Sequence, residues 1–186
     1  AGQTYTLPFS GDFQIGNALT AIETVQCLRD KGFPVSPEAM VAGLAAATLP
    51  CRQQVLSREP LILLDGAHNP QAISALACTL KRLLGEQPLT LVLGMLRDKD
   101  TALCANTLAP LCRQIFCCTP PNPRALPAAQ LAAQIKPLPG LSVSVAEDPH
   151  QAFQLARQTG NPMVVTGSFY LASLFCPTGL EEDQRE

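Results

Sequence analysis

The sequence lacks the features that would place it in several large classes of protein. Its 186 residues carry a formal net charge of −2 without any cluster of Lys and Arg, which argues against a nucleic-acid partner. No apolar run approaches the roughly 20 residues of a membrane-spanning helix, so no membrane contact is expected. Residues 1–11 contain no basic region followed by an apolar stretch, and so do not resemble a signal peptide.

Several motifs that would signal a reaction are missing as well. The chain has no G-x-x-x-x-G-K-[ST] phosphate loop, no G-x-G-x-x-G motif and no G-x-S-x-G nucleophile elbow. Eight cysteines are present, but no C-x-x-C pair occurs, so neither a zinc site nor a thioredoxin-like motif is indicated. We expect all eight to be unpaired and to act as small buried hydrophobic residues of a cytoplasmic protein.

The first 50 residues have a helical pattern. Apolar residues recur at helical spacing over 17–32 and stop at Gly32, and a second helix is expected to start after Ser36, its N-cap. Two helices of this size bury little apolar surface by themselves. We therefore interpret 1–50 as the helical end of a preceding domain with its hinge, and 178–186, which lacks apolar periodicity, as a flexible tail.

Residues 51–177 alternate between predicted strands and helices. The expected strands are 61–64, 90–93, 114–118, 141–145 and 163–166. The expected helices are 70–84, 100–111, 127–135, 149–158 and 169–174. Such alternation predicts an α/β, Rossmann-like domain: a mostly parallel sheet with helices on both faces.

Polar or Gly- and Pro-rich stretches follow the predicted strands: DGAHNP, GMLRDKD, TPPNPRALP, AEDP and TGS. In an open parallel sheet, ligands bind beyond the carboxyl ends of the strands. We therefore expect a site along this edge, with residues 65–69 as one wall. Gly66 is expected to supply either a backbone angle or a close approach that a side chain would forbid.

Structural roles are the alternative for many of these polar residues. Helix capping is favoured for the residues at expected helix starts: Asn69, Asp98, Asp100 and Asp148, the last in a capping box with Gln151. Asp98 and Asp100 also resemble a metal pair. His68 could be a loop histidine with satisfied hydrogen bonds, and Ser168 could cap the last helix or present its backbone N–H to an anion.

Taken together and in this order, the strand-end motifs resemble the C-terminal domain of the folylpolyglutamate synthase/dihydrofolate synthase family, in the Mur ligase superfamily. The resemblance is carried from residue 11 to about 176 by GDFQIGNALTA, CRQQVLSREPLILLDGAHNP, LVLGMLRDKD, PPNPRALP, VAEDP and VTGSFYLA. It implies an ATP-dependent ligase that adds L-glutamate to a folate through an acyl phosphate. The family's phosphate loop, Mg²⁺ ligands and most of its folate site lie in the preceding domain, so this chain alone is expected to be inactive.

The resemblance also implies roles for particular residues. Asn17 matches an asparagine that faces adenine, Arg52 a catalytic arginine that reaches the nucleotide phosphates, and Asp65 an acid that holds the nucleotide ribose. His68 matches a catalytic histidine near the incoming glutamate, and Ser168 a serine of the glutamate site. The resemblance implies no metal ligand on this chain, and a monomer is expected.

Two residues depart from the family pattern. Phe13 replaces a histidine, which could turn an adenine contact into packing. Cys51 replaces the glycine of a P-G-R hinge, which predicts a hinge that is stiffer or differently placed. Two other functions remain open: a free-standing nucleotide- or amino-acid-binding module, and a Mur-type ligase for another amino acid. A phosphate loop upstream of Ala1 would favour a ligase, whereas a native start near Ala1 would favour the module.

Overall fold

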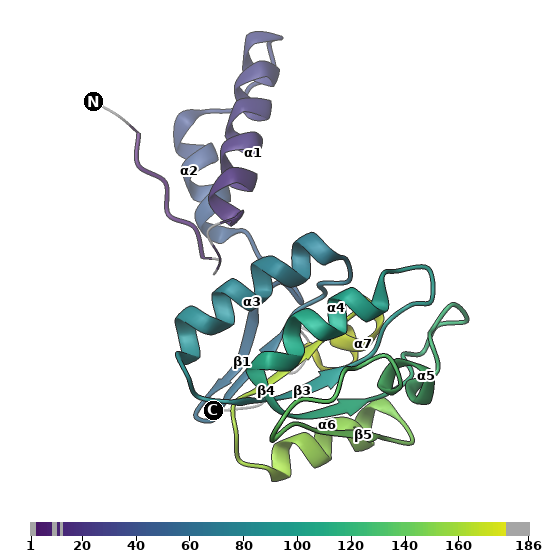
Figure 1. The fold of residues 1–186 in the computed structure, drawn as a ribbon. Helices are drawn as coiled ribbons and strands as arrows, with labels where there is room; N and C mark the ends of the chain where they lie inside the picture. The colour runs from purple at the N-terminus through teal and green to yellow at the C-terminus, as the bar shows by residue number, and fades with distance from the viewer. Residues whose placement is uncertain (1–2, 9–10, 12, 178–186) are drawn as a thin grey trace. The chain divides into compact units, whose positions relative to one another are not determined.

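The computed structural model describes residues 3–8, 11 and 13–177 (Figure 1). The chain divides into two compact units, Ala1–Leu49 and Pro50–Glu186, and each is described by itself. The expected tail, 178–186, lies outside the described residues.

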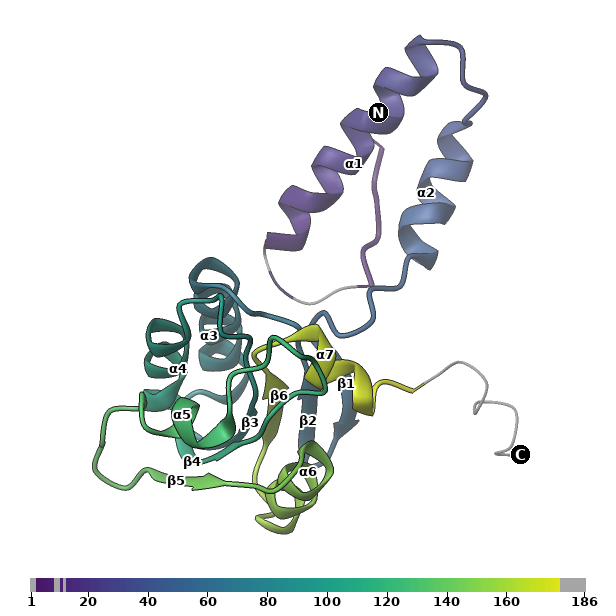
Figure 2. The ribbon, with the colours of Figure 1, turned by 90° about the vertical axis from the view of Figure 1, so that its right-hand side faces the viewer.

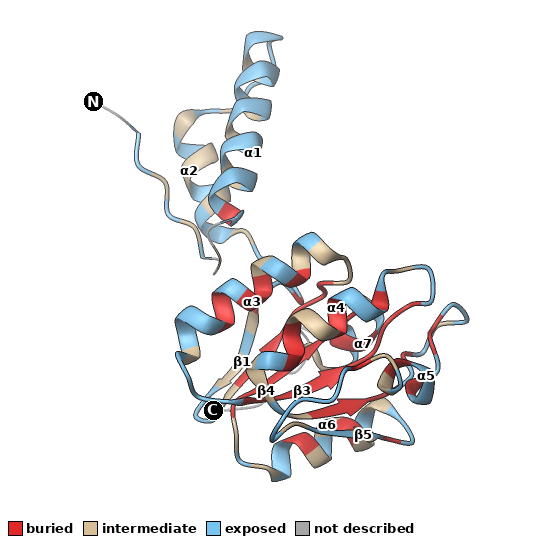
Figure 3. Cartoon of the chain, viewed as in Figure 1, coloured by how far each residue is buried: buried red, intermediate tan, exposed pale blue. Residues whose placement is uncertain are grey.

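The first unit contains α1 (Phe13–Asp30) and α2 (Pro37–Ala46). The chain turns after α1 at Gly32, which has a φ of +90°, a left-handed angle that favours glycine. The Ser36 hydroxyl caps α2 by accepting a hydrogen bond from the N–H of Ala39 at 3.1 Å, as predicted. Of the described residues in these two helices, Gln14 alone is buried, so the pair has little core of its own (Figure 3).

The described residues of the second unit form a six-stranded sheet in the order β1-β2-β6-β3-β4-β5. Its strands are β1 (Gln54–Arg58), β2 (Leu61–Leu64), β3 (Leu89–Leu93), β4 (Cys112–Cys117), β5 (Ser142–Val145) and β6 (Met163–Thr166). All neighbouring pairs are parallel except β1 and β2. The predicted α/β class is confirmed. The strand β1 was missed, because its five residues are exposed or half-buried and form no apolar run.

Helices cover both faces of the sheet (Figure 2). They are α3 (Pro70–Leu84), α4 (Thr101–Leu108), α5 (Ala128–Ala132), α6 (Pro149–Gln158) and α7 (Phe169–Ala172), with short 3₁₀ turns at Ala109–Leu111 and Ser173–Phe175. One core cluster joins α3, α4 and α5 to one face, and the other joins α6 and α7 to the opposite face. Cys117 belongs to the first cluster and Cys118 to the second, because successive strand residues point to opposite faces.

Most of the predicted helix caps are confirmed. Asn69 accepts a hydrogen bond from Ala72 N–H at 2.9 Å, Asp100 one from Leu103 N–H at 3.1 Å, and Asp148 one from Gln151 N–H at 2.9 Å. Asp98 is not a cap: its carboxylate lies 3.2 Å from the Lys99 ammonium and 3.7 Å from the Arg124 guanidinium. These ion pairs are exposed, so they contribute little to stability.

All eight cysteines lie in the described part of the chain, and each is a free thiol. The prediction that all are buried was wrong for Cys27 and Cys78, which are exposed, and only partly right for Cys112 and Cys176. Cys78 lies on the outer side of α3, whose buried residues are Ile73, Leu76, Ala77, Thr79 and Leu80. Cys27 lies on α1, which has almost no buried face.

Candidate functional site

The site is built where β2 and β6 end side by side. These strands are parallel and register Leu64 opposite Val165, so the chain leaves both strands at the same edge of the sheet. The backbone stays paired beyond the strands: Gly167 N–H donates to the carbonyl of Ala67 at 3.0 Å. The loop that holds residues 65–69 therefore lies directly against the turn that starts α7.

Phe169 lies at the centre of the site. The guanidinium carbon of Arg52 lies 4.6 Å from the centroid of the Phe169 ring, a cation–π distance. The imidazole of His68 lies on the same ring, with centroids 5.9 Å apart and planes tilted by 60°. Two residues from separate segments, Arg52 and His68, thus meet on the aromatic ring of a third segment. Phe169 was not among the predicted site residues, because an aromatic residue at a helix start is usually part of a core.

Gly66 and Gly167 allow this close packing. A Cβ at Gly66 would collide with the Phe169 ring, which confirms that this glycine serves a close approach. Gly167 has a φ of +102°, and a Cβ there would lie 2.6 Å from the carbonyl oxygen of Gly94. Both positions therefore exclude a side chain for steric reasons.

Asp65 is buried beneath the site, with 4% of its surface exposed. Its Oδ1 accepts a hydrogen bond from Ala67 N–H at 2.7 Å, and its Oδ2 accepts one from Gln53 N–H at 3.0 Å. Burial raises the pKa of this carboxyl, while the two backbone N–H groups and the nearby Arg52 oppose the rise. The carboxylate thus fastens the segment carrying Arg52 to the loop carrying His68.

The segment that Asp65 holds has an unusual backbone. Cys51 and Gln53, on either side of Arg52, have φ values of 56° and 48°, in the left-handed region that residues with side chains seldom adopt. Cys51 thus adopts the backbone that glycine would favour here. Its carbonyl accepts a hydrogen bond from Gly66 N–H at 2.7 Å, which adds a second tie between the two segments.

Asp65→Asn tests this role of the carboxylate. An amide offers one acceptor oxygen, so either Gln53 or Ala67 would lose its buried hydrogen bond. We expect the free energy of unfolding to fall by about 1–2 kcal/mol, because relief of the buried charge offsets part of the loss. Urea denaturation measures it. Asp98→Asn, in an exposed carboxylate, should change stability by less than about 0.5 kcal/mol, and equal losses would contradict the role.

His68 is half-buried and has a defined orientation. Its Nδ1 lies 2.8 Å from the carbonyl oxygen of Gly66. A carbonyl only accepts, so Nδ1 carries the proton in the neutral ring and Nε2 keeps its lone pair. The ring can therefore accept a proton or a hydrogen bond at Nε2.

Ser168 is 2% exposed, and its hydroxyl oxygen accepts a hydrogen bond from Leu171 N–H at 3.2 Å. The predicted cap of α7 by the Ser168 hydroxyl is therefore confirmed. Arg52 is exposed and His68 half-buried, whereas Asp65 and Ser168 are buried. The four residues adjoin one another, but the side chains of the last two do not open onto the surface.

Asn17 belongs to the first unit. It is exposed on α1, and its Nδ2 donates to Gln14 Oε1 at 2.7 Å. Phe13, one helical turn earlier, keeps 37% of its surface exposed.

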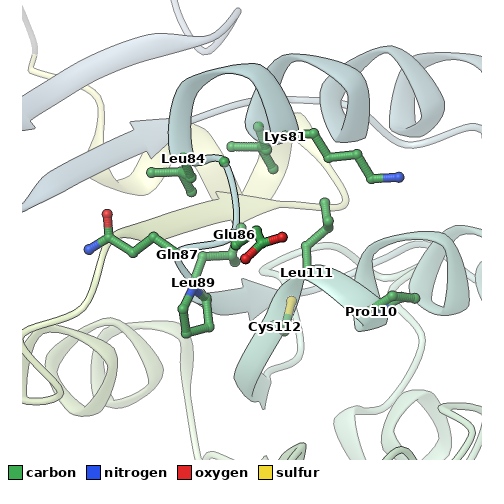
Figure 4. Close-up of a pocket in the computed structure, with 11 residues that line it drawn as sticks. Lys81, Leu84, Glu86, Gln87, Leu89, Pro110, Leu111 and Cys112 are labelled. Carbon is green, nitrogen blue, oxygen red and sulfur yellow. The ribbon is translucent and has the colours of Figure 1, made fainter.

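A small pocket lies at the opposite edge of the sheet, near the amino ends of β3 and β4 (Figure 4). Its volume is about 120 Å³, and Lys81 and Glu86 are its charged residues. It contains none of the predicted site residues. Within the described ranges, no three His, Cys, Asp or Glu side chains gather so that they could hold a metal ion, and no helix is long and apolar enough to span a membrane.

The mostly parallel sheet with helices on both faces places the second unit in the α/β, Rossmann-like class, with a cation and an imidazole at its carboxyl edge. Residues 51–169 match the family model described as Mur ligase, glutamate ligase domain. The chain belongs to this family, which confirms the resemblance that its motifs carry.

Relatives and solved structures agree with this assignment. The chain is 37% identical over 172 residues to folylpolyglutamate synthase of Lacticaseibacillus casei, covering 90% of this chain and 38% of that protein. A Mycobacterium tuberculosis folylpolyglutamate synthase complexed with ADP superposes with a TM-score of 0.80 at 31% identity, covering 90% of this chain and 40% of that one. A bifunctional folylpolyglutamate synthase/dihydrofolate synthase with Mn, AMPPNP and L-glutamate bound gives 0.76 at 32% identity, covering 93% and 41%. The chain thus spans about two fifths of these proteins.

Proposed function

We propose that this chain is the C-terminal part of an ATP-dependent ligase that adds L-glutamate to a folate through an acyl phosphate. The observation that carries the proposal is the meeting of Arg52 and His68 on Phe169, at the carboxyl edge of the sheet. At that edge the guanidinium can bind phosphate oxygens, and the imidazole can accept a hydrogen bond or a proton from an incoming amine. The match to a glutamate ligase domain and the names of the relatives support the same reaction.

The nucleotide is assigned to Arg52, Asp65 and Asn17. The guanidinium of Arg52 is exposed and held over an aromatic face, so it can offer a fixed cation to phosphate oxygens. Asp65 serves the nucleotide by fixing the segment of Arg52, in addition to any contact with ribose. Asn17 is an exposed amide that could donate to and accept from an adenine edge.

ATP supplies the phosphoryl group when it is bound, and Mg²⁺ neutralises its charge. Our proposal assigns the metal to residues outside this chain, since the described residues contain no suitable cluster. Arg52 remains the group through which this chain can stabilise charge during phosphoryl transfer.

L-glutamate is assigned to His68 and Ser168. The free Nε2 of His68 can accept a hydrogen bond or a proton from the amino group and so orient it for attack on the acyl phosphate. Ser168 is buried, so we propose that it serves the glutamate site indirectly, by capping the helix that presents Phe169 beside His68. We further propose a monomer that acts in the cytoplasm, where thiols stay reduced.

His68→Ala, made in the full-length protein, tests the assignment of His68 to the amino group of glutamate. We expect kcat for glutamate-dependent ADP release with a reduced folate to fall about 10²-fold, a typical share for one proton-accepting group. The melting temperature should stay near that of the wild type, because a half-buried loop imidazole contributes little packing.

The second histidine of the chain provides the control. His150 is exposed, and its ring lies against Phe175 at a centroid distance of 5.4 Å. His150→Ala should keep the wild-type rate. Equal rates for wild type and His68→Ala would refute the role of His68, and absence of folate- and glutamate-dependent turnover in the wild type would refute the ligase.

A further inference from the structure

Cys51 and Cys176 come together in the fold although they stand near opposite ends of the second unit. One oxygen, Oε1 of Gln54, accepts a hydrogen bond from the backbone N–H of Cys51 at 2.9 Å and from the thiol of Cys176 at 3.3 Å. Cys176 also packs against the core cluster that contains Cys51. The fold thus brings together two free cysteines that are far apart in the sequence.

The surroundings give the two thiols different access to solvent. Cys51 is 3% exposed and belongs to the core cluster under α6 and α7. Cys176 packs against the rim of that cluster and is half-buried. A small oxidant can therefore reach the Cys176 thiol, whereas the Cys51 thiol is shielded from solvent.

We propose that Cys51 and Cys176 form a redox-sensitive pair that closes to a disulfide when the protein meets a peroxide or a low-molecular-weight disulfide. The proposal depends on the meeting of the two cysteines at Gln54 Oε1 and holds whether or not the chain belongs to a folate ligase.

The reaction with hydrogen peroxide proceeds in two balanced steps. The Cys176 thiolate attacks one peroxide oxygen: an S–O bond forms, the O–O bond breaks, and the hydroxide released takes up a proton to give water. The Cys51 sulfur then attacks the Cys176 sulfur as its thiol gives up its proton: the S–S bond forms, the S–O bond breaks, and the hydroxide released takes up that proton and leaves as a second water. Two thiols lose two electrons, and one peroxide becomes two waters.

The order of the steps follows from burial. Removal from water raises the pKa of the Cys51 thiol to about 12, and the neighbouring Cys176 adds to the rise. Cys51 therefore forms few thiolates at neutral pH and is a poor first attacker, which leaves the first step to the more accessible Cys176.

The disulfide would restrict the motion of the segment that carries Arg52. Cys51 directly precedes Arg52 and has a left-handed φ of 56°. Its carbonyl already holds Gly66 N–H. A bond from Cys51 to Cys176, which follows the 3₁₀ turn Ser173–Phe175, would add a covalent anchor, so oxidation should make the segment around Arg52 more rigid.

The test uses the whole chain with Cys27→Ser and Cys78→Ser, which remove the two exposed thiols that could cross-link separate molecules. The folded protein is treated with hydrogen peroxide or, in parallel, oxidised glutathione. It is then alkylated under denaturing conditions and digested for mass spectrometry. We expect loss of two thiols, a linked peptide pair containing Cys51 and Cys176, and full recovery with reductant. The oxidised chain should also unfold at a higher urea concentration, because a long loop is closed.

Two variants serve as matched controls. Cys176→Ser should show no internal disulfide. It is preferred to Cys51→Ser because it leaves the buried Cys51 in place and so keeps the core intact. Cys104→Ser removes a buried thiol in the other core cluster and should still form the pair. An unchanged thiol count, a mixed disulfide that stops at Cys176, or linkage of a different pair would each overturn the proposal.

Discussion

Replacing Leu63 by aspartate is expected to unfold the second unit. Leu63 is 1% exposed in β2, where it pairs with Val55 on one side and Val164 on the other. Its side chain belongs to the core cluster under α3 and α4. A carboxylate there has no partner, and its burial costs several kcal/mol. That cost is comparable to the total stability of a typical domain, about 5–15 kcal/mol.

Circular dichroism with urea or thermal denaturation measures this effect. The matched control is Leu83→Asp, the same substitution at a leucine of α3 that is 52% exposed. We expect the control to melt within a few degrees of the wild type, since surface substitutions usually change stability by about 0.5 kcal/mol or less. A Leu63→Asp chain with a wild-type melting curve would contradict the central position of β2.

The central strands could be predicted because they are buried on both faces. Strands β2, β3, β4 and β6 carry continuous apolar runs that end at turn residues, and the structure has them as neighbours in the sheet. The edge strand β1 could not be found in this way. Its residues Gln54–Arg58 lack such a run, and the strand exists because its backbone pairs with β2, an interaction that leaves no pattern in the sequence.

The site was predictable only in part, for a related reason. Arg52 and His68 stand in short motifs at a strand end or hinge, so their approach to one edge follows from the order of the parallel strands. Phe169 was missed because its role is a contact with residues about one hundred positions away. The buried hydrogen bonds of Asp65 were missed too, because they depend on the left-handed backbone at Cys51 and Gln53.

Replacing Arg52 by alanine in the complete protein is expected to lower kcat about 10³-fold, with a smaller change in KM for ATP. A cation that meets the transferring phosphoryl group is needed most in the transition state, and in comparable enzymes such an arginine contributes about 10³-fold or more. Single-turnover and steady-state assays of ADP formation measure the effect. Arg58→Ala, in an exposed arginine at the end of β1, is the matched control and should keep the wild-type rate.

Phe169→Leu separates the charge of Arg52 from its placement. Leucine keeps an apolar side chain beside Gly66 but removes the aromatic face beneath the guanidinium, 4.6 Å away. A cation–π contact contributes about 0.5–2 kcal/mol, so we expect kcat to fall about 2- to 30-fold, well short of the loss for Arg52→Ala. Phe169→Tyr keeps the ring and should restore most of the rate. Wild-type turnover by Arg52→Ala would refute the phosphate role. A Phe169→Leu enzyme as fast as the wild type would show instead that Arg52 is positioned by Asp65 and its backbone partners without help from the ring.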